Sequence, residues 1–141
     1  MLKNIPSIVS PDLLKILMEM GHGDEIVISD GNFPAAAMAQ RLVRLDGHGV
    51  PDILEAILAL MPLDIYVEEP VALMEVVKGD SYVPEIWDTY KKIIEEKEGQ
   101  KKIAHEERFA FYERAKKAYA VVATGETSLY ANIILKKGVV V

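Results

Sequence analysis

The chain has no cysteine and no long apolar run. Without cysteine it can form no disulfide, thiol nucleophile or thiolate metal site, and this composition suits a reducing compartment. No apolar stretch approaches the roughly 20 residues that a membrane-spanning helix needs. Residues 1–6 also lack the apolar stretch of a secretion signal. We therefore predict a cytoplasmic protein with no membrane partner.

Basic side chains are in deficit as well: 16 lysines and arginines stand against 22 acidic residues, which gives a net charge of −6. This balance argues against nucleic acids and anionic membranes as partners. A length of 141 residues, 50% of them hydrophobic, predicts a single domain over residues 1–141. The apolar fraction is high for this size and residues 139–141 are all valine, so we expect apolar surface to be buried between subunits.

Several catalytic signatures are missing. There is no Gly-x-Ser-x-Gly turn of a serine hydrolase. No Gly-x-Gly-x-x-Gly follows a strand, as dinucleotide binding requires. The histidines, His22, His48 and His105, are scattered and are never four residues apart, as they would be in a helical metal site. We therefore expect no metal site and no dinucleotide-binding loop.

The residue pattern predicts helices that alternate with apolar strands. The expected helices cover residues 10–21, 51–62, 84–97 and 107–117, with a helical turn at 35–40. The expected strands cover residues 26–28, 41–46, 71–77, 119–124 and 132–135. We expect residues 65–67 to be extended and residues 95–102 to form a polar connector. Such alternation is typical of an α/β fold whose parallel or mixed sheet carries helices on both faces.

The segment Gly21-His22-Gly23-Asp24 holds the main candidate for acid–base chemistry. The flanking glycines leave the His22 side chain accessible, and histidine is the side chain best suited to exchange protons near neutral pH. The alternative is that His22 only ends a helix and hydrogen-bonds nearby carbonyls. We expect His48, also between glycines, to be a loop residue, and His105 to be a solvated residue of a polar connector.

Asp30 follows the strand that begins just after His22. As a strand, the run from Glu25 to Asp30 spans roughly 20 Å, at about 3.3 Å per residue. His22 and Asp30 would then lie at opposite ends, too far apart for one small ligand. If both act on one substrate, either the loop doubles back or the site lies between two subunits. Like Asp24, Asp30 is also a common type of residue at strand ends and turns.

Two further groups suit a polyhydroxylated ligand. Tyr130-Ala131-Asn132 precedes the last strand and offers a phenol, an amide and backbone groups. The alternative for Tyr130 is a structural tyrosine at a turn. Arg108 offers a planar set of donors and shares a helix face with Tyr112, four residues on. The alternative for Arg108 is a surface ion pair with an acidic residue.

Together these motifs resemble a known family. The resemblance covers residues 2–139 and rests on His22-Gly23-Asp24, Asp30, Asn32-Phe33-Pro34, 108–115, Thr124-Gly125-Glu126 and 130–138. In these segments the chain is similar to the L-fucose mutarotases and D-ribose pyranases. The resemblance implies sugar-ring isomerisation without metal or cofactor, and a three-layer α/β/α fold with a mixed, mostly parallel sheet. It also implies a homo-oligomer, often a decamer of two pentameric rings.

The resemblance also implies roles for single residues. His22 would be the catalytic acid, and the sugar would be bound by Asp30, Arg108, Tyr130, Ala131 and Asn132. The mutarotase branch is similar to this chain in residues 108–115 and 136–138, whereas His105-Glu106-Glu107 echoes a pyranase motif three residues too early. We therefore predict interconversion of the α and β anomers of L-fucose. The alternatives are a D-ribose pyranase and a non-catalytic monosaccharide-binding accessory protein.

Overall fold

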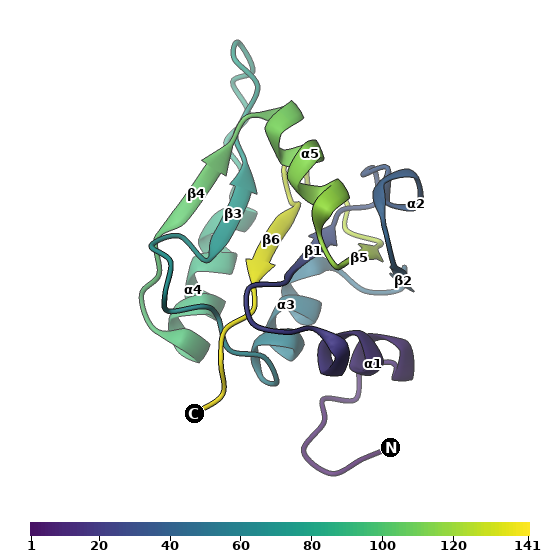
Figure 1. The fold of residues 1–141 in the computed structure, drawn as a ribbon. Helices are drawn as coiled ribbons and strands as arrows, with labels where there is room; N and C mark the ends of the chain where they lie inside the picture. Colours follow the sequence, from purple (N-terminus) through teal and green to yellow (C-terminus); the bar gives the residue numbers. More distant parts are fainter.

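A six-stranded sheet organises the fold (Figure 1). The computed structural model describes residues 1–141. Its strands are β1 (Glu25–Ser29), β2 (Leu42–Leu45), β3 (Val71–Met74), β4 (Ile103–Glu106), β5 (Ala120–Thr124) and β6 (Ile133–Lys136). Its helices are α1 (Pro11–Glu19), α2 (Ala35–Met38), α3 (Val50–Leu58), α4 (Ile86–Glu98) and α5 (Arg108–Lys117). The strand order across the sheet is β2-β5-β1-β6-β3-β4.

All strands but β6 run in one direction. β1 and β2 are each parallel to β5, and β3 is parallel to β4, whereas β6 is antiparallel to both of its neighbours, β1 and β3. The prediction of a mixed, mostly parallel sheet is therefore confirmed. Because β6 is reversed, its amino end meets the carboxyl ends of β1 and β3 at the same edge of the sheet.

Helices cover both faces of the sheet, as predicted (Figure 1). Alternate strand residues point to opposite faces. Ile26 and Ile28 pack into a core shared with α1, α3 and α4, and Val27 packs into a second core with α2 and α5. The first core contains 22 buried residues and the second 11, so α2 and α5 form the thinner of the two helical layers. None of the helices combines the length and apolarity required to span a bilayer.

Local contacts define both ends of α1. The Ser10 hydroxyl accepts the Leu13 amide at 3.1 Å and so caps the first turn. At the other end Lys137 Nζ donates to the carbonyls of Leu17 (2.9 Å) and Met20 (2.5 Å). A cation at this position pairs with carbonyls that the helix leaves free and opposes the negative end of its dipole. The residue that follows β6 is thereby tied to the turn that follows α1.

An ion-pair cluster holds α5 against the sheet. Arg114 donates to Glu25 at 2.6 Å and to Glu106 at 3.0 Å. The hydrogen bond with Glu25 raises the pKa of Arg114, against the opposing effect of burial. At the amino end of α5 the Glu107 carboxylate accepts two backbone amides of the first turn, at 3.0 and 3.1 Å. The helix is thus fixed at its start and along its inner side.

Two predictions of a polar connector were wrong: α4 continues to Glu98, into the segment 95–102, and His105 lies in a strand, β4, that was not predicted. β4 is an edge strand that pairs only with β3, and it is half-buried at most. An edge strand needs no continuous apolar run, which is why the pattern was missed. His105 is exposed, as expected, but lies within this strand, and its ring centre is 5.2 Å from that of Trp87.

Two other segments differ from the prediction. β3 ends at Met74, not at residue 77, and residues 75–85 form the connection to α4. Residues 65–67 form no strand. The Asp64 carboxylate accepts the Tyr66 amide at 3.0 Å, a local turn that competes with strand pairing.

Candidate active site

Two clusters of polar side chains lie at opposite ends of the central strands, and each is called an edge after the end of the strands on which it lies. The first, the histidine edge, consists of His22, Asp64 and Tyr66, beside the amino end of β1. The second, the cavity edge, lies where the carboxyl ends of β1 and β3 meet the amino end of β6. The five residues of β1 separate them by about 17 Å, at about 3.3 Å per residue. The chain therefore does not bring His22 and Asp30 together.

The turn that carries His22 is held by backbone contacts. Gly23 has a φ of +88°, a left-handed conformation that suits glycine. Its amide donates to the Lys137 carbonyl at 2.9 Å. The Gly21 amide donates to the Asp24 carboxylate at 2.7 Å. Asp24 thus stabilises the turn itself and places His22 at its tip.

Asp64 orients the His22 ring. Nε2 of His22 lies 3.0 Å from Oδ1 of Asp64. Burial raises the pKa of the Asp64 carboxyl, but hydrogen bonds from the Tyr66 amide and from His22 outweigh burial, and that pKa lies below its ordinary value. Asp64 is therefore ionised near neutral pH and can only accept, so Nε2 of His22 carries the hydrogen and Nδ1 is left for a ligand. The His22 side chain is 45% exposed, so a ligand can reach it.

Sequence reasoning missed Asp64. The alternative interpretation of His22 was a bond to a nearby carbonyl, whereas its partner is a carboxylate 42 residues further along the chain. Asp64 lies in an irregular segment after α3, and no local pattern marks it. The signal that brings it to His22 is tertiary: the neighbouring Leu63 forms a bridge with Lys137, just beyond β6.

The cavity edge is a hollow of about 240 Å³ with both polar and apolar lining residues. Part of its wall is aromatic, since the rings of Phe33 and Tyr112 meet edge to face with centres 5.7 Å apart. The residues that line it are Asp30, Asn32, Phe33, Met74, Asp80, Tyr112, Leu129, Tyr130 and Asn132. Three of the predicted sugar-binding residues, Asp30, Tyr130 and Asn132, thus lie around one hollow.

Asp30 is only 8% exposed. Its carboxylate accepts the Asn32 amide at 3.0 Å, and its own amide donates to Asn132 Oδ1 at 2.7 Å. Burial raises the pKa of Asp30 above its ordinary value, although nearby backbone amides lower it in part. A carboxyl in such surroundings is well placed to exchange a hydrogen with a ligand hydroxyl. Because Oδ1 of Asn132 is occupied, the hydrogens on its Nδ2 remain for a ligand.

Hydrogen bonds from two side chains of α4 hold the segment 130–132 in place. Tyr130 has a φ of +56°, which is uncommon for a residue other than glycine. Its carbonyl accepts the Trp87 indole N–H at 2.7 Å, and the Ala131 carbonyl accepts the Tyr90 hydroxyl at 2.6 Å. Ala131 is fully buried and does not line the hollow. Its place in the segment is to anchor the two residues that do.

Arg108 lies on the exposed first turn of α5, outside the set of lining residues. Its Nε donates to the Tyr112 hydroxyl at 3.3 Å, and this hydrogen bond raises the pKa of Arg108. Its partner is therefore a tyrosine, not the acidic residue of the alternative interpretation. Tyr112 lines the hollow, so the guanidinium contacts a residue of the hollow's wall.

The motif Thr124-Gly125-Glu126 supports the cavity edge from behind. The Thr124 hydroxyl donates to the Ser29 carbonyl at 2.7 Å, and the Glu126 carbonyl accepts the Gly31 amide at 2.9 Å. A Cβ on Gly125 would collide with the Asp46 carbonyl, so glycine is required there. These contacts fix the chain on both sides of Asp30.

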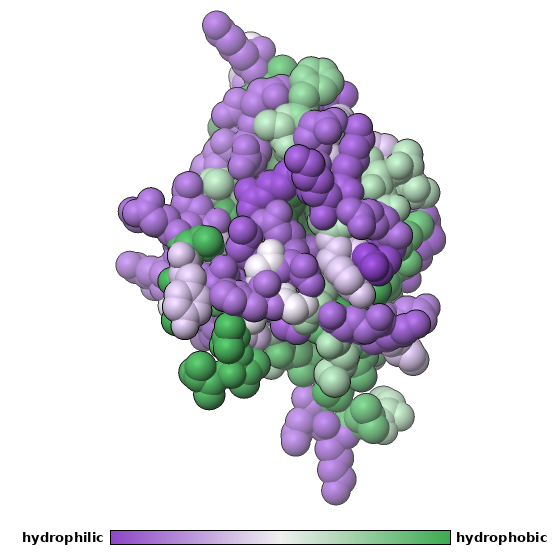
Figure 2. Space-filling model, viewed as in Figure 1, coloured by the Kyte–Doolittle hydropathy of each residue, from purple (hydrophilic) through white to green (hydrophobic).

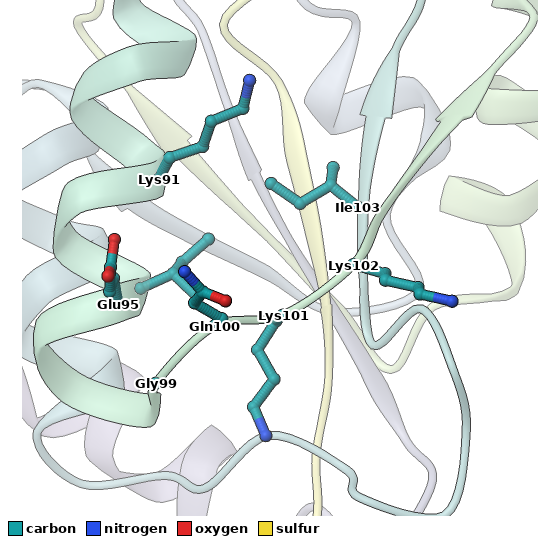
Figure 3. Close-up of a pocket in the computed structure, with 8 residues that line it drawn as sticks. Lys91, Glu95, Gly99, Gln100, Lys101, Lys102 and Ile103 are labelled. Carbon is teal, nitrogen blue, oxygen red and sulfur yellow. The ribbon is translucent and has the colours of Figure 1, made fainter.

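A larger hollow, of about 460 Å³, lies between α4 and the segment that leads into β4. Figure 3 shows Lys91, Lys101 and Lys102 pointing in different directions around it. Its lysines do not converge, and none of the predicted site residues lines it. The smaller hollow at the cavity edge is therefore the better candidate for a ligand site. Nowhere in residues 1–141 do three His, Asp or Glu side chains gather as metal ligands would.

Comparison with known proteins gives one matching family model, that of the RbsD / FucU transport protein family, over residues 3–140. The fucose mutarotase of Homo sapiens is 52% identical over 144 residues, which cover 98% of this chain and 94% of that protein. The L-fucose mutarotase of Actinobacillus pleuropneumoniae serotype 5b (strain L20) is also 52% identical, over 99% of this chain and 97% of that protein.

Two similar solved structures hold different sugars. The fucose mutarotase of Streptococcus pneumoniae in complex with L-fucose superposes with a TM-score of 0.95 at 60% identity, over 99% of this chain and 100% of that one. RbsD of Bacillus subtilis complexed with D-ribose superposes with a TM-score of 0.78 at 28% identity, over 100% of both chains. The fold is common to both, and the similarity is greater to the structure that holds fucose.

Proposed function

This chain belongs to the RbsD / FucU transport protein family, and from that premise we propose that it is an L-fucose mutarotase. It is an isomerase that interconverts the α and β anomers by opening and reclosing the sugar ring. Relatives with this name at 52% identity support the proposal, as does the 60% identity to a structure with L-fucose bound. Within the chain, the observation that carries it is a reachable, oriented histidine together with a hollow of mixed polar and apolar lining that is small enough for one sugar.

The chemistry needs a group that gives and takes protons. Ring opening removes the proton of the anomeric hydroxyl and adds one to the ring oxygen; the aldehyde then rotates and the ring recloses on its other face. When His22 carries a hydrogen on both ring nitrogens, Nδ1 can deliver its proton to the ring oxygen and take it back as the ring recloses, while Nε2 stays hydrogen-bonded to Asp64. The reverse reaction uses the same group in the opposite role.

The cavity edge supplies the groups that hold the sugar. The Asp30 carboxyl accepts a hydroxyl hydrogen, and Asn132 donates from Nδ2. Arg108 can donate from the guanidinium hydrogens that Tyr112 leaves free. Asp30 also lies where it can take a proton as the ring opens, since burial already favours its protonated form. The cavity edge thus supplies the binding groups and one proton acceptor, and the histidine edge supplies the second group that transfers a proton.

We propose that His22 of one subunit faces the cavity edge of a neighbour. The length of β1 separates the two clusters, so one chain alone cannot place both on one monosaccharide. Exposed apolar side chains support an assembly: Met1, Leu2, Met18, Val139, Val140 and Val141. Figure 2 shows apolar side chains gathered around the C-terminus on an otherwise largely polar face. A decamer of two pentameric rings is the assembly we propose, and a cytoplasmic location stays a prediction from the composition.

Exchange NMR on the anomeric protons tests the function. We expect the protein to accelerate α/β exchange of L-fucose, and His22→Ala to abolish the acceleration while the circular dichroism spectrum stays unchanged. Faster ring exchange of D-ribose with unchanged fucose exchange would favour the pyranase. Sugar binding without acceleration of either exchange would favour an accessory protein.

Mixed assemblies test the shared site. His22→Ala and Asp30→Ala subunits should each be inactive alone. In a ring formed from equal amounts of both, about one contact in four joins an intact His22 to an intact Asp30, so about a quarter of the activity should return. Mixed assemblies that sediment like the wild type yet recover nothing would contradict a site between neighbours.

A further inference from the structure

The connection between β3 and α4, residues 75–85, lies beside the cavity edge. Figure 1 shows it projecting beyond the end of the sheet, next to the first turn of α5. Two contacts give it a defined shape: the Asp80 amide donates to the Val77 carbonyl at 3.0 Å, and Asp80 Oδ1 accepts the Tyr82 amide at 2.9 Å. Asp80 is thus the residue around which this connection turns, and it also lines the hollow.

The same connection contacts the Tyr130 side chain three times. The Tyr130 hydroxyl donates to Asp80 Oδ2 at 2.7 Å and accepts the Val77 amide at 3.3 Å. The ring of Tyr82 stacks on that of Tyr130, with centres 5.9 Å apart and an interplanar angle of 27°. One short segment therefore holds the ring and both polar functions of a predicted sugar-binding residue.

These contacts leave the Tyr130 hydroxyl with one free function. A phenol has one hydrogen to donate and two lone pairs to accept with. Asp80 takes the hydrogen and the Val77 amide takes one lone pair. What remains for a ligand is an acceptor, which matches a sugar hydroxyl that donates its hydrogen.

We propose that Asp80 is a positioning residue of the sugar site, which acts by holding Tyr130 as a hydrogen-bond acceptor for one hydroxyl of the sugar. The inference rests on the proposed function and assigns Tyr130 to binding rather than to proton delivery. Two charged groups influence the pKa of the phenol: Asp80, from the connection, is hydrogen-bonded to it, and the positive charge of Arg108, from α5, acts in the opposite direction. The hydrogen bond with Asp80 raises the pKa of Tyr130 and lowers that of Asp80, so the phenol stays protonated in this pair.

A double-mutant cycle on fucose affinity tests the coupling. Asp80→Ala and Tyr130→Phe should each weaken L-fucose binding about tenfold, the loss expected for one hydrogen bond. The double variant should bind no more weakly than Tyr130→Phe alone, because Asp80 acts through that hydroxyl. Glu85→Gln removes a different exposed carboxylate from the same connection, and we expect it to leave the affinity unchanged. Losses that multiply in the double variant would overturn the proposal.

A titration without sugar gives an independent readout. In protein with ring-labelled tyrosine, NMR should assign the Tyr130 signal by its loss in Tyr130→Phe. Asp80→Asn keeps an oxygen that can accept but removes the charge, so Tyr130 should titrate at lower pH than in the wild type. An unmoved Tyr130 titration would overturn the pairing. If wild-type protein binds no L-fucose, the proposed function fails as a whole; if it binds fucose and only the cycle is additive, the role of Asp80 alone fails.

Discussion

The histidine edge and the cavity edge use carboxylates in opposite ways. At the histidine edge, hydrogen bonds from Tyr66 and His22 lower the pKa of Asp64 and keep it charged. At the cavity edge, burial raises the pKa of Asp30, and the carboxyl is held less firmly in its charged form. A carboxylate that stays charged is suited to orienting another side chain. A carboxyl whose pKa is shifted towards neutral pH is suited to exchanging a proton with a ligand.

The two edges also differ in how they are built. The histidine edge consists of a turn and an irregular segment that β6 brings together, and its histidine is half-exposed. The cavity edge is built from strand ends and is supported by a turn in which Gly125 packs against the Asp46 carbonyl. Each edge carries part of what a mutarotase needs. Substitutions of His22 and Asp64 should therefore affect turnover, whereas substitution of a cavity-edge residue that only binds, such as Asn132, should affect affinity.

The largest effect should come from His22→Ala. General acid–base catalysis contributes about 10²- to 10⁴-fold, and we expect a loss of that size in the exchange rate of L-fucose. Fucose affinity, measured by calorimetry, should change much less. Asn132→Ala should do the reverse, weakening affinity more than turnover. Equal losses of fucose affinity in His22→Ala and Asn132→Ala would contradict the division of turnover and affinity between the two edges.

Asp64→Asn should lower turnover by about 10- to 100-fold, as the loss of a partner that orients a functional histidine commonly does. The asparagine can still accept from Nε2 of His22, but it lacks the charge that keeps the hydrogen there. Saturation-rate exchange NMR measures the change. Glu68→Gln removes an exposed carboxylate that follows closely in sequence, and full activity is expected of it.

Gly138 packs next to the histidine edge and Gly125 next to the cavity edge. Replacing either with alanine should lower the free energy of unfolding by about 1–3 kcal/mol. A Cβ on Gly138 would collide with the Leu63 carbonyl and lie 3.0 Å from the Asp64 Cα, so turnover should fall. A Cβ on Gly125 would collide with the Asp46 carbonyl and disturb the cavity edge, so affinity should fall. Gly47→Ala is the matched control, because its Cβ meets nothing within 4 Å. Chemical denaturation and calorimetry together would show whether the two effects separate.

The smallest expected effects are on the pH dependence of stability. The contributions of Asp64 and Asp30 should change in opposite directions as the pH rises. The lowered pKa of Asp64 contributes stability that is present above the unfolded pKa, about 3.9, and is lost as pH falls through the folded value. The raised pKa of Asp30 contributes stability that is present below the unfolded pKa and is lost as pH rises through the folded value.

At pH 7, therefore, the free energy of unfolding of Asp64→Asn should be lower than that of the wild type. That of Asp30→Asn should be equal or slightly higher. Both differences should be about 1 kcal/mol or less. Urea unfolding at pH 7 and at pH 3 measures both, and the difference between Asp64→Asn and the wild type should shrink at the lower pH. Destabilisation by Asp30→Asn at pH 7 would contradict the opposite use of the two carboxylates.

Much of the fold could be predicted from the sequence because its inner strands are strongly apolar. Strands such as β1 and β5 are buried on both faces, and continuous apolar runs mark them clearly. β4 was missed because an edge strand with one half-buried side carries no such run. The end of β3 was placed too late because Val76 and Val77 continue its apolar pattern beyond the last paired residue.

The candidate site could be predicted only where its residues are close to one another or to a turn. His22, Asp30 and Asn132 stand next to glycines or at strand ends, and their positions follow from the strand pattern. Asp64 and Asp80 come from irregular segments, and only the packing of β6 and of residues 75–85 brings them to His22 and Tyr130. The spacing of His22 and Asp30 across β1 was predicted, since strand length follows directly from residue count.

The reversed strand β6 has a consequence for the arrangement of sites in a ring. Its amino end leads from the cavity edge, and the residues just past its carboxyl end hold the turn of His22. In an assembly with sites between neighbours, each subunit would contribute to two different sites, one at either end of this strand. The length of β6 would then set the repeat distance between successive sites. A deletion within β6 would alter every site of the ring at once, and a slip of one residue would turn its side chains to the wrong faces of the sheet.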